Sequence, residues 1–364
     1  MDDGLQERGN IGEWSELYAL AYLLVRGGAN AADENQKPIT DLYFKVLEVI
    51  INSHNLQSEL RYEINDETIL IHEDEQLIER VTKSSVKFLM EKLFCDLMSD
   101  SNRKTFSVDS GAKLMGLLHK KTISAGSSER ESDIQLIIAD PQTGGPTPRF
   151  GFSIKSQLGQ ASTLLNSSGS TNLIYEIVPN STLTQKALPD ISDSPSSHPK
   201  NIRRIYEAGY VLKFHAYQSE VFYENLTYID SQMPQNLAEV LLQSYLRDDL
   251  KDFSRVSELA FPPALKSSQQ PLFKLQEFLG AVSMGLRPNA PWKGNSSKFK
   301  GLIVIKIDGE IVFYYLNSRL NFERYLYQGV RFERPSTSRH KYGYIFSESG
   351  RNFIKLNLQI RFKK

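Results

Sequence analysis

Apolar side chains recur at helical spacing near the start of the chain. In "NIGEWSELYALAYLLV" they fall three or four residues apart and predict an amphipathic helix with one buried stripe, formed by Trp14, Leu17, Tyr18, Ala21, Leu24 and Val25. Asn10 and Glu13 have the spacing of a capping box at its first turn. Glu16 lies beside Glu13 but off the apolar stripe, so the capping box gives it no structural role.

Alternation with a period of two residues predicts two strands in the middle of the chain. "SDIQLII" and "FGFSIKSQ" both alternate, and a Pro- and Gly-rich stretch separates them. On the second strand, Ser153 and Lys155 share the face opposite Phe152 and Ile154. If the strands pair as a hairpin and bury their aliphatic faces together, Asp133 comes near Ser153 and Lys155.

The remaining pattern predicts a mixture of strands and helices. We expect strands within 38–80, an exposed loop over 181–200, and helices near 82–98, 111–121, 200–209, 235–247 and 271–284. "GLIVIKIDGEIVFYYL" reads as a hairpin with Asp308 and Gly309 at its turn. In "FIKLNLQIRF" the alternation predicts one inward set and one outward set, namely Ile354, Leu356, Leu358 and Ile360 inward, and Lys355, Asn357, Gln359 and Arg361 outward.

Composition indicates an ordinary globular protein. The 364 residues are 40% hydrophobic and 24% charged, and no apolar run reaches the roughly 18 residues of a membrane span. The polar "MDDGLQERGN" start argues against a secretory signal. A single cysteine, Cys95, excludes an internal disulfide and a Cys-rich zinc site, and fits a reducing cytoplasm. Its apolar neighbours in "KFLMEKLFCDLM" suggest a core thiol.

Charge is unevenly distributed along this neutral chain. Lys293–Lys364 carries 15 Lys and Arg against 5 Asp and Glu, whereas the first 292 residues carry 28 against 38. Because phosphate contacts come mainly from Lys and Arg, the basic tail suggests a surface that faces a polyanion such as nucleic acid. A solubilising surface with no partner would show the same excess.

Asp133 and Lys155 have the residue types of a phosphate-cleaving site. A carboxylate beside a lysine at a sheet edge can hold a divalent cation and position a water against a phosphate. An ordinary surface salt bridge between the two fits the same spacing. A single carboxylate is a poor site for Mg²⁺, which prefers an octahedron of oxygen ligands, so a second acid is expected. Glu16 is the favoured candidate, and Glu131 and Glu176 are alternatives.

Long segments of the chain resemble type II restriction endonucleases of the HpaII group, within the PD-(D/E)XK nuclease superfamily. The segments are "GEWSELYALAYLL", "SDIQLII", "GFSIKSQLGQASTLLNSSGSTNLIY" and "RPSTSRHKYGYIF" with "IKLNLQIRF". The resemblance implies Asp133 and Lys155 as catalytic residues. Ser153 stands where the superfamily usually has an acid, which strengthens the need for Glu16 as the second metal ligand. Gln157 follows on the strand and is a further candidate, for orienting the lysine, the water or the nearby backbone.

The resemblance also implies a fold and an activity. The expected fold is mixed α/β: a central mixed sheet flanked by helices, with additional C-terminal β structure. We expect a nuclease core over 1–180, a largely helical connection over 181–300 and a basic β region over 301–364, an arrangement that one continuous domain would also accommodate.

The expected activity is Mg²⁺-dependent hydrolysis of double-stranded DNA at a short palindrome, such as CCGG. A palindrome favours a homodimer on DNA, and a cognate methyltransferase is expected in the same system without direct binding. The alternative is a catalytically degenerate DNA-binding protein.

Three segments are candidates for contacting DNA. The stretch 156–172 is rich in hydroxyls and amides, which suit base edges but also suit a polar turn: Ser156, Gln160, Ser162, Asn166, Ser170 and Asn172. The stretch 331–344 offers either base or phosphate contacts: Arg331, Arg334, Ser336, Arg339, His340 and Lys341. The stretch "PWKGNSSKFKG" offers phosphate contacts from Lys293, Lys298 and Lys300. His119 in "LLHKK" is interpreted as a structural or phosphate-facing histidine.

Overall fold

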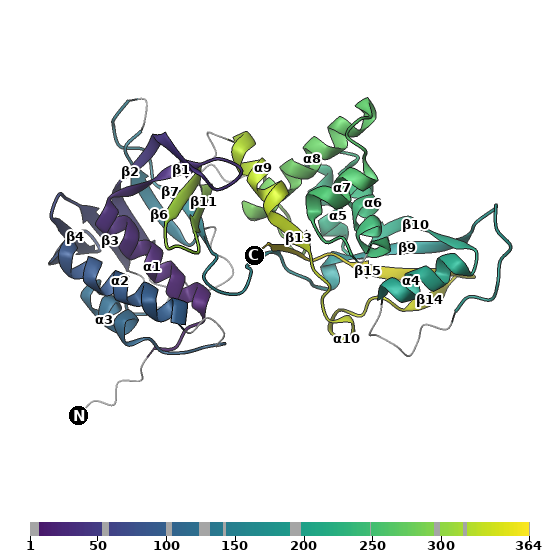
Figure 1. Ribbon diagram of the computed structural model, residues 1–364, viewed down its shortest axis with the longest axis horizontal. Helices are drawn as coiled ribbons and strands as arrows, with labels where there is room; N and C mark the ends of the chain where they lie inside the picture. Colours follow the sequence, from purple (N-terminus) through teal and green to yellow (C-terminus); the bar gives the residue numbers. More distant parts are fainter. Residues whose placement is uncertain are drawn as a thin grey trace. The chain divides into compact units, whose positions relative to one another are not determined.

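The computed structural model divides the chain into two compact units, and Figure 1 labels their elements. The described residues are 7–52, 58–99, 104–123, 132–140, 143–189, 198–247, 249–294, 299–315 and 319–363. Unit 1 contains residues 1–162 and 296–325, and unit 2 contains residues 163–295 and 326–363. Each unit is therefore built from two separate stretches of sequence.

Unit 1 is organised around a nine-stranded mixed sheet in the order β1-β12-β11-β7-β6-β2-β3-β4-β5. Its strands are β1 (Gly28–Ala32), β2 (Pro38–Asn52), β3 (Glu59–Ile64), β4 (Thr68–Glu73), β5 (Gln76–Thr82), β6 (Ile134–Ile138), β7 (Phe150–Ser156), β11 (Phe299–Ile305) and β12 (Ile311–Tyr315). β7 pairs with β11 in parallel and with β6 antiparallel, so the strand that opens with Phe150 lies inside the sheet.

Three helices lie side by side over this sheet in Figure 1: α1 (Ile11–Arg26), α2 (Lys83–Ser99) and α3 (Asp109–Leu117). The predicted capping box opens α1, since the Asn10 side chain accepts from the Glu13 N–H and the Glu13 carboxylate accepts from the Asn10 N–H. Trp14, Leu17, Tyr18, Ala21 and Leu24 are buried in the core of this unit, and Val25 packs against it partly buried. This packing confirms the predicted helix and fixes which of its faces stays open.

The two predicted hairpins of unit 1 are confirmed. In β6 and β7, Ile134 pairs with Phe152, and both side chains are buried, as the alternation predicted. In β11 and β12 the turn uses Gly309, whose φ of 81° lies in the left-handed region that favours glycine.

Unit 2 combines two smaller sheets with helices. The four-stranded sheet has the order β10-β9-β15-β14 and the three-stranded sheet the order β13-β16-β8. The strands are β8 (Thr163–Leu165), β9 (Asn172–Pro179), β10 (Tyr210–Tyr217), β13 (Val330–Phe332), β14 (Ile345–Glu348), β15 (Arg351–Asn357) and β16 (Ile360–Phe362). The helices are the 3-10 turn η1 (Gly169–Thr171), α4 (His198–Glu207), α5 (Glu220–Thr227), α6 (Met233–Leu246), α7 (Phe253–Ala260), α8 (Lys266–Ser283) and α10 (Thr337–His340). α9 (Arg319–Gly329) continues from unit 1 into unit 2.

The mixed α/β class is therefore confirmed, with a large mixed sheet flanked by helices and further C-terminal strands. None of the helices in the described ranges is long and apolar enough to span a membrane.

Two expectations were wrong in detail. Cys95 is exposed rather than a core thiol, because it lies on the open face of α2. Asn357 and Gln359 were expected to face outward, but they are only 0% and 8% exposed. The strand ends at Asn357 and a new one begins at Ile360, so the alternation does not continue through the break.

Candidate active site

Asp133 is held in place by the backbone of the neighbouring strand β7. It lies one residue before β6, and the register of the hairpin places it opposite Ser153. Its N–H donates to the Phe152 carbonyl at 3.0 Å, and its Oδ2 accepts the Ile154 N–H at 2.6 Å. The partner of this oxygen is thus the strand backbone rather than the Lys155 ammonium.

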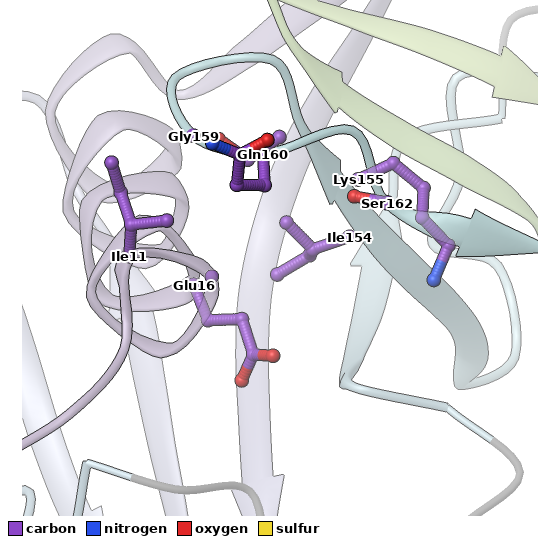
Figure 2. A pocket seen from close by; sticks show the side chains of 9 residues that line it. Ile11, Glu16, Ile154, Lys155, Gly159, Gln160 and Ser162 are labelled. Atoms are coloured by element: carbon purple, nitrogen blue, oxygen red, sulfur yellow. The ribbon is translucent and has the colours of Figure 1, made fainter. Parts of the chain in front are cut away.

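The first turns of α1 and the end of β7 border a cleft of about 200 Å³. Its lining consists of Ile11, Gly12, Glu16, Ile154, Lys155, Ser156, Gly159, Gln160 and Ser162. Figure 2 shows Glu16 and Lys155 on either side of Ile154, with their charged ends projecting to the same side of the view. Glu16, the favoured second acid, therefore lies in the same cleft as Lys155, although it is almost 140 positions earlier in the sequence.

Close packing of Gly159 sets the spacing across this cleft. A Cβ at Gly159 would lie 2.1 Å from Cγ2 of Ile11, so only glycine lets the loop after β7 approach the first turn of α1 this closely. Glu16 is on the second turn of the same helix. The contact therefore holds the helix that carries Glu16 close to the loop that follows β7.

The pKa of Glu16 is raised from 4.5 to about 8. Burial is the largest cause, and repulsion from Asp133 is the next, while the positive charges of Lys120 and Lys155 act in the opposite direction. Two carboxylates that repel each other in a partly buried place are stabilised when a cation lies between them. The donor chemistry therefore fits a hard divalent ion.

Lys120 is a member of the site that the sequence did not reveal. It follows α3, and its ammonium donates to the carbonyls of Thr122 and Ile123. Its attraction acts on Glu16 more strongly than that of Lys155. The segment "LLHKK" had drawn attention for His119, whose side chain is exposed. No spacing rule distinguishes Lys120 from the lysine beside it.

The alternative acids are not brought to this cleft by the described structure. Glu131 lies outside the described residues, and Glu176 lies on β9 of unit 2, where it pairs with Arg351 at 3.4 Å. Within the described ranges no group of three or more His, Cys, Asp or Glu side chains is arranged to hold a metal. Glu16 lines the cleft and interacts electrostatically with Asp133, so two carboxylates are near each other, and water and phosphate oxygens would have to complete an octahedron.

Gln157 has a partner other than Lys155. Its Nε2 donates to Oε1 of Gln36 at 2.7 Å, and its N–H donates to the Ile305 carbonyl at 3.0 Å. Gln36 lies in the turn between β1 and β2. Gln157 therefore connects the end of β7 to that turn.

The stretch 156–172 is divided between the two units. Its first part, with Ser156, Gln160 and Ser162, lines the cleft of unit 1. Its second part belongs to unit 2, where Asn166 is exposed and Ser170 is partly exposed.

Several of the residues predicted to contact DNA have partners within the protein. Asn172 is 1% exposed and donates to Gln218 and to the His340 carbonyl, which speaks against a direct base contact. Arg334 stacks 3.9 Å from the Tyr245 ring centre and donates to the Ser244 carbonyl. Arg331 pairs with Glu333 at 2.8 Å.

Other candidates keep their polar groups at the surface. Ser336, Arg339, Lys341 and Lys293 are exposed. His340 lies with its Nε2 3.1 Å from the Ser167 hydroxyl, and burial and the neighbouring Arg339 lower its pKa. Lys300 lies over the Phe150 ring in unit 1, and Lys298 is outside the described residues.

Comparison with known proteins decides the family. The family model of the HpaII restriction endonuclease matches residues 10–362. A curated protein named type II restriction enzyme HpaII, from Haemophilus parainfluenzae, is 34% identical over 97% of this chain and 98% of its own length. The chain belongs to the HpaII restriction endonuclease family. The resemblance noted in the sequence is thereby confirmed.

Membership in the HpaII family makes the chain a site-specific deoxyribonuclease, and its substrate is double-stranded DNA. No solved structure matches the chain. The geometry of its cleft therefore has to be interpreted from the residues themselves.

Proposed function

We propose that the chain is a type II restriction endonuclease that hydrolyses DNA with Mg²⁺ held by Asp133 and Glu16. The coupling of these two carboxylates beside Lys155 carries the proposal, since each residue comes from a different part of the sequence. A bound Mg²⁺ would neutralise charge on the phosphate oxygens and lower the pKa of a water molecule. The target is a short palindrome such as CCGG, which the family resemblance suggests.

Each side chain has a distinct task in this mechanism. Asp133 is a fixed ligand, because the Ile154 N–H holds one of its oxygens. Glu16 with a pKa of about 8 carries a proton at neutral pH in the free protein, and it would have to lose this proton to hold a cation. Lys155 orients the attacking water and stabilises the negative charge that develops around phosphorus.

The function also suggests partners. A palindromic target presents the same phosphates twice about a two-fold axis, so two copies of the chain would act as a homodimer on DNA. A methyltransferase that protects the same sequence would act in the same system without binding this chain.

Cleavage of plasmid DNA in the presence of Mg²⁺ tests the proposal. Wild type should cut at a defined sequence, which sequencing of the fragment ends would reveal. Lys155→Ala should abolish cleavage and leave DNA binding within about threefold, because a single phosphate-facing charge adds little to binding. Lys113→Ala, which removes an exposed lysine paired with Asp109 on α3, serves as the matched control and should cut normally.

Binding without cleavage by wild type, across plasmids of varied sequence, would instead favour the catalytically degenerate DNA-binding protein. Equal cleavage by Lys155→Ala and wild type would remove the lysine from the mechanism.

A further inference from the structure

Two surface loops of unit 2, residues 166–171 and 336–341, are joined to each other. Ser167 Oγ in the first loop lies 3.1 Å from Nε2 of His340 in the second. Asn172, directly after the first loop, donates its Nδ2 to the His340 carbonyl at 2.9 Å. The 166–171 loop and the 336–341 loop are about 170 positions apart in the sequence, yet they form one local surface.

A buried pair of asparagines lies beneath both loops. Asn357, at the end of β15, is 0% exposed and donates its Nδ2 to the Asn172 Oδ1 at 2.7 Å and to the Ser168 carbonyl at 2.8 Å. Asn172 in turn donates to the second loop and to Gln218 Oε1 at 3.1 Å. The amide pair is thus bonded to the backbone of each loop, one asparagine to each.

Burial makes this arrangement rigid. A buried amide without a hydrogen-bond partner has lost the free energy of its hydration and gained nothing in return. The pair therefore strongly prefers the geometry in which its N–H donors have partners. Side chains hydrogen-bonded in such a network hold the backbone segments they contact in one relative position. The two loops are therefore positioned by residues that DNA cannot touch.

The outer surface of the two loops carries groups suited to base edges. Asn166, Arg339 and Lys341 are exposed, and Ser336 and Ser338 add hydroxyls. Lys341 has a φ of 49°, so the chain turns sharply just after α10. Arginine and asparagine discriminate bases only when their donors and acceptors are correctly placed, which requires a rigid support.

We propose that Asn172 and Asn357 are positioning residues for sequence recognition, which clamp the two loops into a single surface that reads base pairs of double-stranded DNA. The proposal rests on the proposed function. It assigns discrimination between the target and its near matches to a buried amide pair in unit 2, apart from the cleavage chemistry of unit 1.

Unit 2 contains a matched control for this clamp. Asn225 is also 1% exposed, and its Nδ2 donates to the carbonyls of Arg287 and Ala290 while its Oδ1 accepts the Trp292 N–H. It supports the segment that precedes Lys293, a candidate phosphate contact. Asn225→Leu therefore removes a comparable buried amide without touching the 166–171 and 336–341 loops.

The experiment compares discrimination in the full-length variants. Cleavage rates are measured on a duplex with the wild-type target, defined from fragment ends, and on duplexes with single base-pair changes. Asn357→Leu should lower the ratio of target to near-match cleavage by about tenfold, the size of one lost base contact. Asn225→Leu should weaken binding to all duplexes alike and change this ratio by less than about twofold.

Two results would overturn the proposal. One is an unchanged ratio in folded Asn357→Leu, and the other is an equal loss of ratio in Asn225→Leu, which would show a general effect of destabilisation. If Asn357→Leu does not fold, Ser167→Ala tests the proposal instead, because it removes only the hydrogen bond between Ser167 and His340 that joins the loops. It should lower the ratio by about threefold and speed amide hydrogen exchange in residues 336–341; faster exchange with an unchanged ratio would refute the clamp.

Failure of the proposed function gives a different result. If wild type binds DNA but does not cut, the target is defined by selecting bound duplexes, the same ratios are taken from binding constants, and the clamp is tested without cleavage.

Discussion

Replacing Glu16 with glutamine should stabilise the free protein and destroy its activity. The native pKa of about 8 lies above the ordinary value of 4.5, so the folded state binds this proton more tightly than the unfolded state does. Between these two values the free energy of unfolding therefore falls as pH rises, and above pH 8 the loss is complete. Glutamine cannot ionise, so the Glu16→Gln variant escapes this loss.

The size of the effect follows from the pKa shift. At about 1.4 kcal/mol per pKa unit, the interval from 4.5 to neutral pH corresponds to roughly 3 kcal/mol, and screening at the partly exposed carboxylate reduces this to about 2 kcal/mol. The variant and wild type should be equally stable near pH 4. The gap should open through neutral pH and stay constant above pH 8.

Urea unfolding, followed by the fluorescence of buried Trp14 on the same helix, measures this gap at each pH. Glu13→Gln is the control, because glutamine keeps the capping-box acceptor and should change stability by less than about 0.5 kcal/mol. Mg²⁺ at ten times its dissociation constant should stabilise wild type by about 1.4 kcal/mol and the Glu16→Gln variant much less.

A gap that does not vary with pH would refute the electrostatic origin of the effect. A Glu16→Gln variant that still cuts DNA would remove Glu16 from the metal site.

Three further predictions follow from the geometry of the cleft. Asp133→Asn keeps an acceptor for the Ile154 N–H, so its melting temperature should stay near that of wild type while single-turnover cleavage falls by roughly a thousandfold. Gly159→Ala places a Cβ against Ile11, so it should cost about 1–3 kcal/mol in urea unfolding and slow cleavage; adding Ile11→Ala should restore part of both, and no restoration would argue against the contact. Chelation of Mg²⁺ by EDTA should stop plasmid nicking, and excess Mg²⁺ should restore it; nicking that persists in EDTA would exclude the metal mechanism.

Local patterns predicted much of unit 1. The capping box of α1, the β6–β7 hairpin and the Gly309 turn depend on residues close in sequence, and all three are confirmed. The prediction that Glu16 lies near Asp133 rested on the need for a second acid, because Ser153 occupies the position where the nucleases that the sequence resembles usually have one. The structure places Glu16 in the cleft with Lys155 and couples it to Asp133.

Long-range partners could not be predicted in the same way. Lys120 acts on Glu16 through the fold, and its sequence neighbours do not indicate which site it will join. Asn357 continued an alternating pattern and was assigned to the outside, although it is the buried partner of Asn172. Which polar residue is buried depends on where a distant segment ends, and periodicity within one strand contains no information about that.

The place of β7 in the sheet has a consequence for how the enzyme is made. β7 pairs with β6 on one side, but on the other side it pairs with β11, which begins at Phe299. During synthesis, a nascent chain that has not reached Ile305 leaves one edge of β7 unpaired. The sheet around β7 is thus completed only after the first stretch of unit 2, residues 163–295, has been translated. A product terminated before β11 would carry Asp133, Glu16 and Lys155 with a sheet that lacks β11 and β12, and an unpaired strand edge of this kind is prone to aggregation.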